Sequence, residues 1–482
     1  MRLPSSPSSA PPRPASIFGR EYVWVTVGIL ALIFLAAFEA LAVTTVMPTI
    51  SAALNGDSLY ALAFSGPLAV GVVGMVAAGN WSDRSGPVPV VLTAVVLFVV
   101  GLVIAGTAAS MPALIVGRLV HGLGGGALSV SLYVVVARVY PQRMHPAIFG
   151  AFAGAWVVPS LIGPFIAGLV AEYTSWRWVF LGVVVLVLAA LGMLRPGLAS
   201  IAAAERERPV GVREPWRLSR TLWSLGAAAA VLCASMAAQL PGALLWLGTG
   251  AAFVLAGVAL RPLLPAGTLS GRRGLPVVMT IRGLVSGAFL STEVYLPALL
   301  TGEYRLSPVL AGLALSCAGI TWALASWLQG RYATVLTDAG SMLLGSVLLL
   351  IAIAASAATS ALLLPPAVAI AGWAVAGAGM GTLVPRQSGR VLRLSAPEQQ
   401  GFNSSALLIA DSIGAALALA ATAVVFVAFA PVGGTATYTA SFTLSALLAV
   451  GGLLLVGRVG HDAPPAAPAL PASPAPPAAP AG

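Results

Sequence analysis

The chain has 482 residues, of which 59% are hydrophobic and 8% are charged, and its mean hydropathy is +0.98. Soluble domains carry about 25% charged residues, so this composition excludes an ordinary soluble enzyme and indicates a polytopic membrane protein. The net charge of +10 comes from 24 basic residues, all of them arginine. These arginines are not clustered with aromatic residues on one soluble face, which argues against nucleic-acid binding.

Hydrophobic segments long enough to cross a bilayer core of about 30 Å follow one another along the chain. We therefore expect an all-α polytopic membrane protein with about 14 transmembrane helices. The predicted spans lie at 22–47, 59–80, 88–108, 112–139, 145–170, 176–198, 221–238, 242–261, 275–300, 308–330, 338–358, 364–391, 401–429 and 436–458.

Composition also predicts the domain organisation. Proline-rich and polar ends predict disordered tails at residues 1–21 and 459–482, and a charged stretch predicts a linker at 199–220. The remaining segments are predicted to form an N-terminal six-helix bundle, an inserted helix pair and a C-terminal six-helix bundle, at residues 22–198, 221–261 and 275–458.

Arginines alternate between the predicted loops and set the orientation. The N-terminus, every second loop and the C-terminal end carry most of them, whereas the opposite loops hold little beyond Arg177 and Arg305. This bias predicts a multi-pass protein of the cell membrane with both termini and the linker in the cytoplasm. Cys233 and Cys317 lie in apolar segments and the three histidines are scattered, so we expect no metal site and no cofactor.

The two predicted bundles repeat one another. Glu39 precedes Pro48 in the first span, and Glu293 precedes Pro297 in the ninth. The fourth span contains GLGGGAL and the twelfth GAGMGTL; the fifth contains SLIGPFIAG and the thirteenth DSIGAALAL. The loop GNWSDRSG after the second span has a weaker echo in QGRYATVLTDAG after the tenth. Two pseudo-symmetric bundles are how many transporters build alternating access.

Three motifs of the first bundle carry a family resemblance. They are GNWSDRSG with Asp83 and Arg84, the run LIVGR ending at Arg118 with its following glycines, and Gly154-Ala-Trp-Val-Val-Pro159-Ser-Leu-Ile-Gly163-Pro164 to Gly168. With the helix count, they resemble the major facilitator superfamily, in particular its fourteen-helix drug:proton antiporter branch, over nearly all of residues 22–458. The resemblance implies that the helix-five motif limits proton leak; helix packing alone is the alternative.

The resemblance has one departure. The family's loop motif usually continues with basic residues after its second glycine, whereas this chain has Pro87, Val88 and Pro89. The chain therefore lacks a basic residue for a charge relay at Pro87, Val88 and Pro89, but it retains Asp83 and Arg84. We predict that Asp83, Arg84 and Arg138 form a cytoplasmic gate, in which Asp83 pairs with Arg138 or caps a helix N-terminus. A solvated loop acid is the alternative.

Proton coupling needs a carboxyl group inside the membrane. At 1.5 Å per residue, Glu39 lies about 25 Å from the cytoplasmic edge of its span, and Arg118 about 9 Å from the outer edge of its own. Both therefore fall in the outer half of a bilayer core of about 30 Å. We predict that they form a switchable pair with Glu39 as the proton carrier; a static ion pair is the alternative.

Two other acids are candidates for proton coupling. Glu293 occupies the position that the repeat relates to Glu39, although it could instead reach interfacial water. Asp411 lies near the middle of the thirteenth span, where hydrogen bonding to a serine or to backbone is the alternative. Arg282 is expected to extend toward the cytoplasmic interface rather than to serve a cavity.

Few polar side chains lie in the spans, and this favours a small hydrophobic or amphiphilic substrate. The aromatic candidates for a substrate cavity are Trp156, Tyr133, Tyr295 and Trp322. The predicted function is a proton-coupled exporter of such compounds, drugs among them, with substrate, proton and membrane lipid as partners and a monomeric chain. The alternatives are a dedicated exporter of one endogenous lipid or secondary metabolite, and an intramembrane enzyme that would pair His121 with Ser129 or Ser131.

Overall fold

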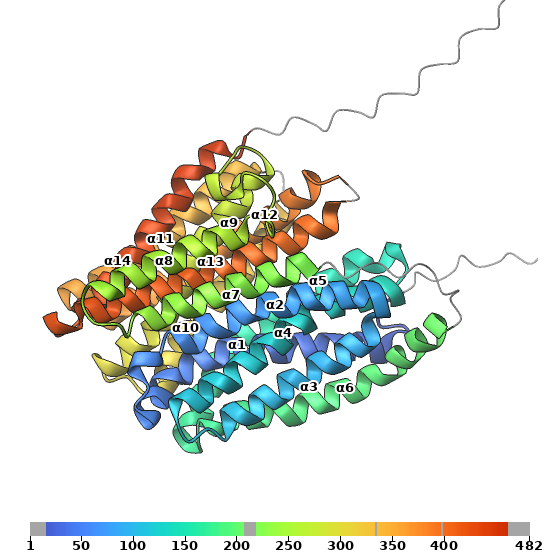
Figure 1. The fold of residues 1–482 in the computed structure, drawn as a ribbon, viewed down its shortest axis with the longest axis horizontal. Helices are drawn as coiled ribbons and strands as arrows, with labels where there is room; N and C mark the ends of the chain where they lie inside the picture. Colours follow the sequence, from blue (N-terminus) through green and yellow to red (C-terminus); the bar gives the residue numbers. More distant parts are fainter. Residues whose placement is uncertain (1–15, 207–217, 333–334, 397–398, 461–482) are drawn as a thin grey trace, which may run out of the picture.

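The computed structural model describes residues 16–206, 218–332, 335–396 and 399–460. In that part of the chain the regular elements are helical, and fourteen helices are long and apolar enough to cross a membrane, which confirms the predicted fold class (Figure 1). These helices are α1 (Val23–Leu54), α2 (Leu62–Ser85), α3 (Pro87–Gly106), α4 (Met111–Val139), α5 (His145–Tyr173), α6 (Arg177–Arg206), α7 (Leu218–Ala237), α8 (Ala243–Leu260), α9 (Leu275–Gly302), α10 (Pro308–Arg331), α11 (Asp338–Leu362), α12 (Pro366–Arg393), α13 (Gln400–Phe429) and α14 (Ala436–Leu455).

The helices form two bundles with the same internal neighbours. In the first bundle α1 packs on α5 and α6, α4 packs on α2 and α3, and α3 packs on α6. Each of these pairs has a counterpart in the second bundle, with helix numbers higher by eight. There α9 packs on α13 and α14, α12 packs on α10 and α11, and α11 packs on α14. The bundles meet along two interfaces, α5 with α10 and α2 with α13. Because α5 corresponds to α13 and α2 to α10, these two interfaces are related by the same pseudo-symmetry. The architecture is therefore pseudo-symmetric, as the sequence repeat predicts.

The inserted helices α7 and α8 pack on each other and lie beside one of the two inter-bundle interfaces. Helix α7 contacts both α2 and α13, between which Figure 1 shows it. A hydrogen bond of 2.9 Å joins the hydroxyl groups of Ser65 on α2 and Ser235 on α7, and Asn80 donates to Thr221 at 3.2 Å. The α5–α10 interface is the one that this helix pair does not cover.

Glycines of α4 and α12 set how closely the helices of each bundle approach. A Cβ atom at Gly122 or Gly126 would overlap the backbone of α2, and one at Gly124 would overlap α3. In α12, Gly377 and Gly379 stand in the same way against α10 and α11. Small residues at helix interfaces permit this close approach of neighbouring helices.

Several predicted segment boundaries differ from the structure. Helix α1, for example, ends at Leu54 and not at residue 47, and α7 begins at Leu218, inside the predicted linker. Helix α6 continues to Arg206, past the predicted start of the linker at residue 199, because the run SIAAAER consists mostly of good helix formers. At the C-terminal end, Val459 is buried and belongs to the packed part of the chain, although the predicted tail begins there. The predicted tails otherwise fall mostly on residues 1–15 and 461–482, and the linker mostly on 207–217, which lie outside the described residues.

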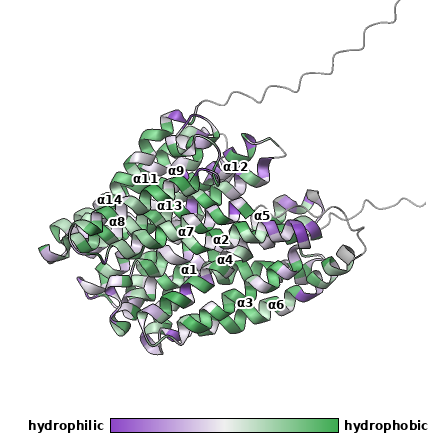
Figure 2. Cartoon of the chain, viewed as in Figure 1, coloured by the Kyte–Doolittle hydropathy of each residue, from purple (hydrophilic) through white to green (hydrophobic). Residues whose placement is uncertain are grey.

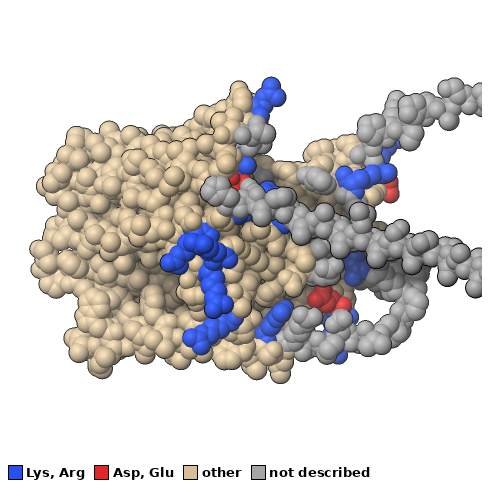
Figure 3. All heavy atoms as spheres, turned by 90° about the horizontal axis from the view of Figure 1, so that it is seen from above, with Lys and Arg blue, Asp and Glu red and all other residues tan. Residues whose placement is uncertain are grey.

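Charge and hydropathy are distributed unequally over the molecule. Apolar residues run along the whole length of the helices (Figure 2). On the face that Figure 3 shows, arginines lie toward one side, while the opposite side is tan. We call the arginine-rich end the one at which α2, α4 and α12 end and α9 begins; it carries Arg84, Arg138, Arg272, Arg273 and Arg393. The opposite end holds the connection between α1 and α2.

Candidate functional site

A buried ion pair lies where α1, α2 and α4 meet. The Arg118 guanidinium of α4 donates through Nη1 to Glu39 Oε1 of α1, and through Nε to the Ala63 carbonyl oxygen of α2 at 3.1 Å. Glu39 and Arg118 are 1% and 5% exposed. An arginine inside an apolar helix needs such partners, because an unpaired charge there is costly. The structure therefore brings together the two residues of the predicted switchable pair.

His121 extends this pair. It lies one turn after Arg118 on α4, and its Nε2 atom is 3.3 Å from Glu39 Oε2, while its Nδ1 atom is 3.5 Å from Arg118 Nη1. Its ring also packs on Phe98 of α3, with 4.3 Å between the ring centroids. Sequence reasoning considered His121 only as a partner for Ser129 or Ser131 and so missed it as a neighbour of the pair. The three-residue spacing from Arg118, which puts both side chains on one helix face, was the available signal.

The same contacts bear on the intramembrane-enzyme alternative, which needs His121 beside a serine. The Ser129 hydroxyl donates to the Gly125 carbonyl oxygen at 2.9 Å, and the Ser131 hydroxyl donates to that of Leu128 at 3.1 Å. Both serines therefore bond to their own helix, while His121 faces Glu39 and Arg118. This arrangement is that of an ionic site and not of a nucleophile with its base.

A second ion pair lies in the C-terminal bundle. Arg282 Nε on α9 donates to Asp411 Oδ1 on α13 at 2.6 Å, and Arg282 Nη1 donates to Gln387 of α12 at 3.4 Å. Ser286 also donates to Asp411, as the serine alternative for this acid anticipated. The expectation that Arg282 extends to the interface is wrong, because a carboxylate within reach on the neighbouring helix holds the guanidinium inside the bundle. The Asp411 side chain is 32% exposed and so faces accessible space.

Glu293 is buried on α9 and, within the described residues, forms no hydrogen bond or ion pair. The glycine motifs of α4 and α12 show why Glu293, unlike Glu39, has no arginine partner. Counting four residues back from Gly122 gives Arg118, and four back from Gly377 gives Trp373. Trp373 is fully buried and stacks on Phe289 of α9, with ring centroids 4.8 Å apart. The C-terminal bundle thus has an aromatic contact where the N-terminal bundle has its arginine.

The predicted gate residues lie at the arginine-rich end. Asp83 and Arg84 are in the last turn of α2 and Arg138 in the last turn of α4, all exposed. Their role as a gate stays a prediction.

The C-terminal bundle has a buried acid at the corresponding place, and sequence reasoning missed it. Asp338, the first residue of α11, is 3% exposed and accepts hydrogen bonds from Arg386, Arg390 and Arg393 of α12. Arg390 also donates to the Val459 carbonyl oxygen at 2.7 Å. The cluster therefore ties α11 and α12 to the chain after α14. The weak loop repeat, TDAG against SDRSG, was its sequence signal.

The helix-five motif forms the α5–α10 interface. A Cβ atom on Gly168 would come within 2.7 Å of the Pro308 carbonyl oxygen, and Gly312 of α10 fits against the carbonyl group of Pro164 in the same way. Gly163 faces Phe38 of α1, whereas Gly154 has open space around it. Pro159 is buried on the same helix. Four of the five motif positions therefore lie in packed surroundings, close to both α1 and α10.

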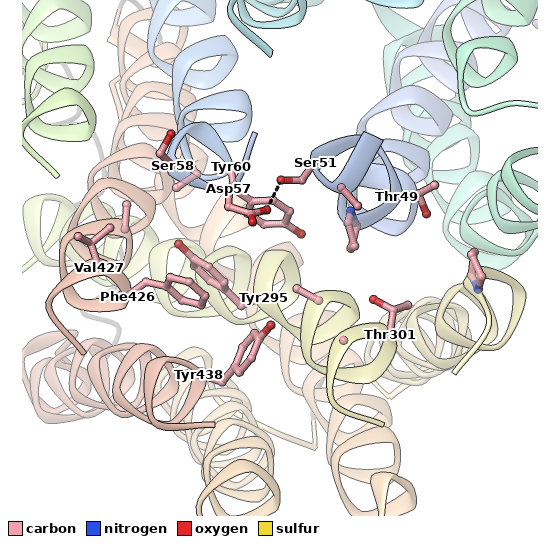
Figure 4. Close-up of a pocket in the computed structure, with 17 residues that line it drawn as sticks. Thr49, Ser51, Asp57, Ser58, Tyr60, Tyr295, Thr301, Phe426, Val427 and Tyr438 are labelled. Carbon is pink, nitrogen blue, oxygen red and sulfur yellow. Dashed lines mark hydrogen bonds between the residues drawn. The ribbon is translucent and has the colours of Figure 1, made fainter. Parts of the chain in front are cut away.

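The four aromatic candidates for a substrate cavity do not all belong to one site among the described residues. Tyr133 of α4 and Trp156 of α5 are about half exposed, and Tyr133 stacks on Phe149. Trp322 packs edge-on against Phe289 within the C-terminal bundle. Tyr295 is buried and lines a cavity of about 600 Å³ at the α1–α2 end of the molecule (Figure 4).

This cavity lies between the two bundles. Its wall comes from the end of α1, the segment before α2, the end of α9, the start of α10, the end of α13 and the start of α14. The Tyr60 hydroxyl of the N-terminal bundle donates to the Val294 carbonyl oxygen of the C-terminal bundle at 2.9 Å. The rings of Tyr60 and Tyr295 lie 5.8 Å apart. At this end the bundles are therefore in direct contact.

Comparisons with known proteins agree with this architecture. The family model of the Major Facilitator Superfamily matches residues 29–419. The MFS-type transporter ppz2 of Metarhizium majus is 25% identical over 338 residues, which make up 64% of this chain and 55% of that protein. The MFS-type efflux pump LUC4 of a Fusarium species is 30% identical over 174 residues, 36% of this chain and 30% of that protein. The chain thus spans about half of the first relative's length and less of the second's.

Among solved structures, an auto-inhibited peptide transporter of the POT family superimposes with a TM-score of 0.67 at 16% identity. The superposition covers 92% of this chain and 99% of that one, and it supports the fold alone. The match of the family model over most of the chain, together with two six-helix bundles around an inserted helix pair, shows that this protein belongs to the Major Facilitator Superfamily.

Proposed function

We propose that the chain is a proton-coupled exporter of hydrophobic and amphiphilic compounds, drugs among them. The observation that carries the proposal is the buried contact of Glu39 with Arg118 and His121 at the junction of three helices. A carboxylate held by a guanidinium stays ionised, whereas a buried carboxyl that loses its cation favours the protonated form. Moving Arg118 relative to Glu39 is therefore a way to bind and release a proton.

The pair couples proton binding to bundle movement because its members lie on different helices. Protonation of Glu39 removes the charge that holds α1 to α4, while Arg118 keeps the Ala63 carbonyl oxygen of α2. Helix α1 also packs on α5 and contacts α9 and α10 of the other bundle. A change at Glu39 is thereby transmitted to the surfaces along which the two bundles meet.

We assign residues 22–198 and 275–458 as the moving bundles and 221–261 as the inserted pair between them. The arginine distribution favours a cell-membrane location with the arginine-rich end and both termini in the cytoplasm. Asp83, Arg84 and Arg138 then lie at the cytoplasmic side, where a gate is needed. A monomer suffices, since one chain supplies both bundles.

Transport in proteoliposomes tests the proposal. We expect wild-type protein to move lipophilic cations or neutral amphiphiles against their gradient when a pH gradient is imposed. The gradient-driven transport rate of the variant Glu39→Gln should be at least tenfold lower than that of wild type, because glutamine cannot exchange a proton. Glu303→Gln removes an exposed acid after α9 and is the matched control.

The outcomes separate the candidate functions. Transport by Glu39→Gln at the wild-type rate and with the wild-type pH dependence would contradict the proposal. Gradient-driven transport of one endogenous lipid or metabolite, with none of the other compounds moved, would favour the dedicated exporter instead.

A further inference from the structure

The cavity at the α1–α2 end contains a feature that the proposed proton site does not use. Four aromatic rings follow one another along its wall from Tyr60 through Tyr295 and Phe426 to Tyr438. Consecutive ring centroids lie 5.8, 5.1 and 5.5 Å apart. Asp57 lies beside Tyr60 on the same wall, and its Oδ1 atom accepts a hydrogen bond from Ser51 at 2.7 Å (Figure 4).

The charge of the lining determines which ligands suit the cavity. Among the 17 described residues that line it, the Asp57 carboxylate is the one group that is charged at neutral pH. The other polar groups are hydroxyls of serine, threonine and tyrosine. A small cavity with an excess negative charge repels anions and attracts cations.

Aromatic faces add to this preference. An organic cation within about 6 Å of a tyrosine or phenylalanine ring is attracted by the ring quadrupole, and aromatic cages bind quaternary ammonium groups in this way. The four rings also offer apolar surface for the body of such a molecule. A volume of about 600 Å³ falls within the range of cavities that hold drug-sized ligands.

The cavity is reachable and bridges both bundles. Asp57, Ser58 and Gly302 on its rim are exposed. Asp57 and Tyr60 belong to the N-terminal bundle, whereas Tyr295, Phe426 and Tyr438 belong to the C-terminal one. A ligand bound between them contacts both bundles at once and depends on their being in contact at this end.

From this geometry we propose that the cavity is a binding site for organic cations with a hydrophobic body. Asp57 neutralises the cation, and Tyr295, Phe426 and Tyr438 cover its apolar surface. The site is separate from the Glu39–Arg118 pair. That exported cations occupy this cavity before their release rests on the proposed export function. That the cavity binds organic cations does not.

Equilibrium binding of radiolabelled tetraphenylphosphonium to the full chain in lipid nanodiscs tests this, after subtraction of empty nanodiscs. We expect saturable binding to wild-type protein and at least tenfold weaker binding to Asp57→Asn. Glu21→Gln, which removes an exposed acid just before α1, at the other end of the helix from the cavity, should bind within about twofold of wild type. Tyr438→Leu should weaken binding severalfold. Tyr438→Phe keeps the aromatic ring and should bind the probe as wild type does.

Probe charge supplies the second comparison. Tetraphenylborate has the same shape and the opposite charge, and we expect no saturable binding of it that depends on Asp57. Each variant is first checked for a single gel-filtration peak, so that a misfolded protein is not taken for a lost site. Wild-type affinity in Asp57→Asn, or equal affinity for the two probes, would overturn the proposal. Asp57-dependent binding without gradient-driven transport would overturn the export function and leave this site standing.

Discussion

Glu39 and Glu293 are buried acids of α1 and α9, two helices that the repeat relates, yet their surroundings differ. Glu39 contacts Arg118 and His121, whereas the position related to Arg118 is taken by Trp373. Glu293 therefore has no arginine at the corresponding place. This difference favours Glu39 as the group that exchanges a charged partner for a proton, and it makes the two halves of the transporter chemically unequal.

The buried pair predicts a specific pattern of stability. Removing one member leaves a buried charge without its partner, which costs about 3–5 kcal/mol, whereas removing both leaves no such charge. We therefore expect Glu39→Gln and Arg118→Gln each to lower the melting temperature in detergent more than the double variant does. The measurement is a thermal-unfolding cycle on the four proteins. Additive losses would mean that the two side chains do not interact in the folded protein.

At the scale of helices, glycine positions decide which surfaces meet. Gly312 and Gly319 of α10 fit against the backbone of α5 at Pro164 and Ser160, so the helix-five motif and α10 are shaped for each other. The five residues of the motif indicate a bend and a close approach but do not name the partner helix. Only the fold identifies that partner as α10 of the other bundle.

This interface predicts the effect of one added methyl group. The Cβ of Gly312→Ala would overlap the Pro164 carbonyl oxygen and force the two helices apart. We expect a severalfold faster collapse of an imposed pH gradient in substrate-free proteoliposomes. Gly330→Ala on the same helix has nothing within 4 Å of the new Cβ and should leave the leak unchanged. Equal leak rates in the two variants would assign the α5–α10 contact to packing alone.

For the whole molecule, the pseudo-symmetry is broken by the inserted pair. The α2–α13 and α5–α10 interfaces are equivalent by the repeat, but α7 lies along the first. The hydrogen bond between Ser65 and Ser235 and the one that Asn80 donates to Thr221 hold α7 to α2. Helix α7 therefore covers the α2–α13 interface, whereas the inserted pair does not cover the related α5–α10 interface.

Orientation is the whole-molecule prediction. In a chain whose Cys233 and Cys317 are replaced by serine, a cysteine in place of Glu303 should react with an impermeant maleimide added to intact cells. A cysteine in place of Arg273 should react only after the membrane is opened. Both positions are exposed, so access to water does not separate them. The reverse labelling pattern would invert the topology and place the gate residues outside the cell.

Patterns within single segments of the sequence predicted the helices and their repeat. Long apolar runs predict fourteen spans because backbone groups in lipid must bond within their own helix, and these spans are confirmed. Gly122 and Gly126, spaced four apart in the sequence, both face α2 at close range because positions four apart share one helix face. Equal motifs in the two halves also predicted the related neighbours of α1 to α6 and α9 to α14.

The sequence by itself thus determined the helix count, the two-bundle plan and the family, because burial and backbone bonding act on each segment separately. Only the tertiary structure decided which charged and aromatic groups meet. His121 beside Glu39, Arg282 with Asp411, and Asp338 among three arginines each join different helices or turns. Such contacts depend on the rotation and depth of neighbouring helices, which packing of the whole bundle sets and no single segment encodes.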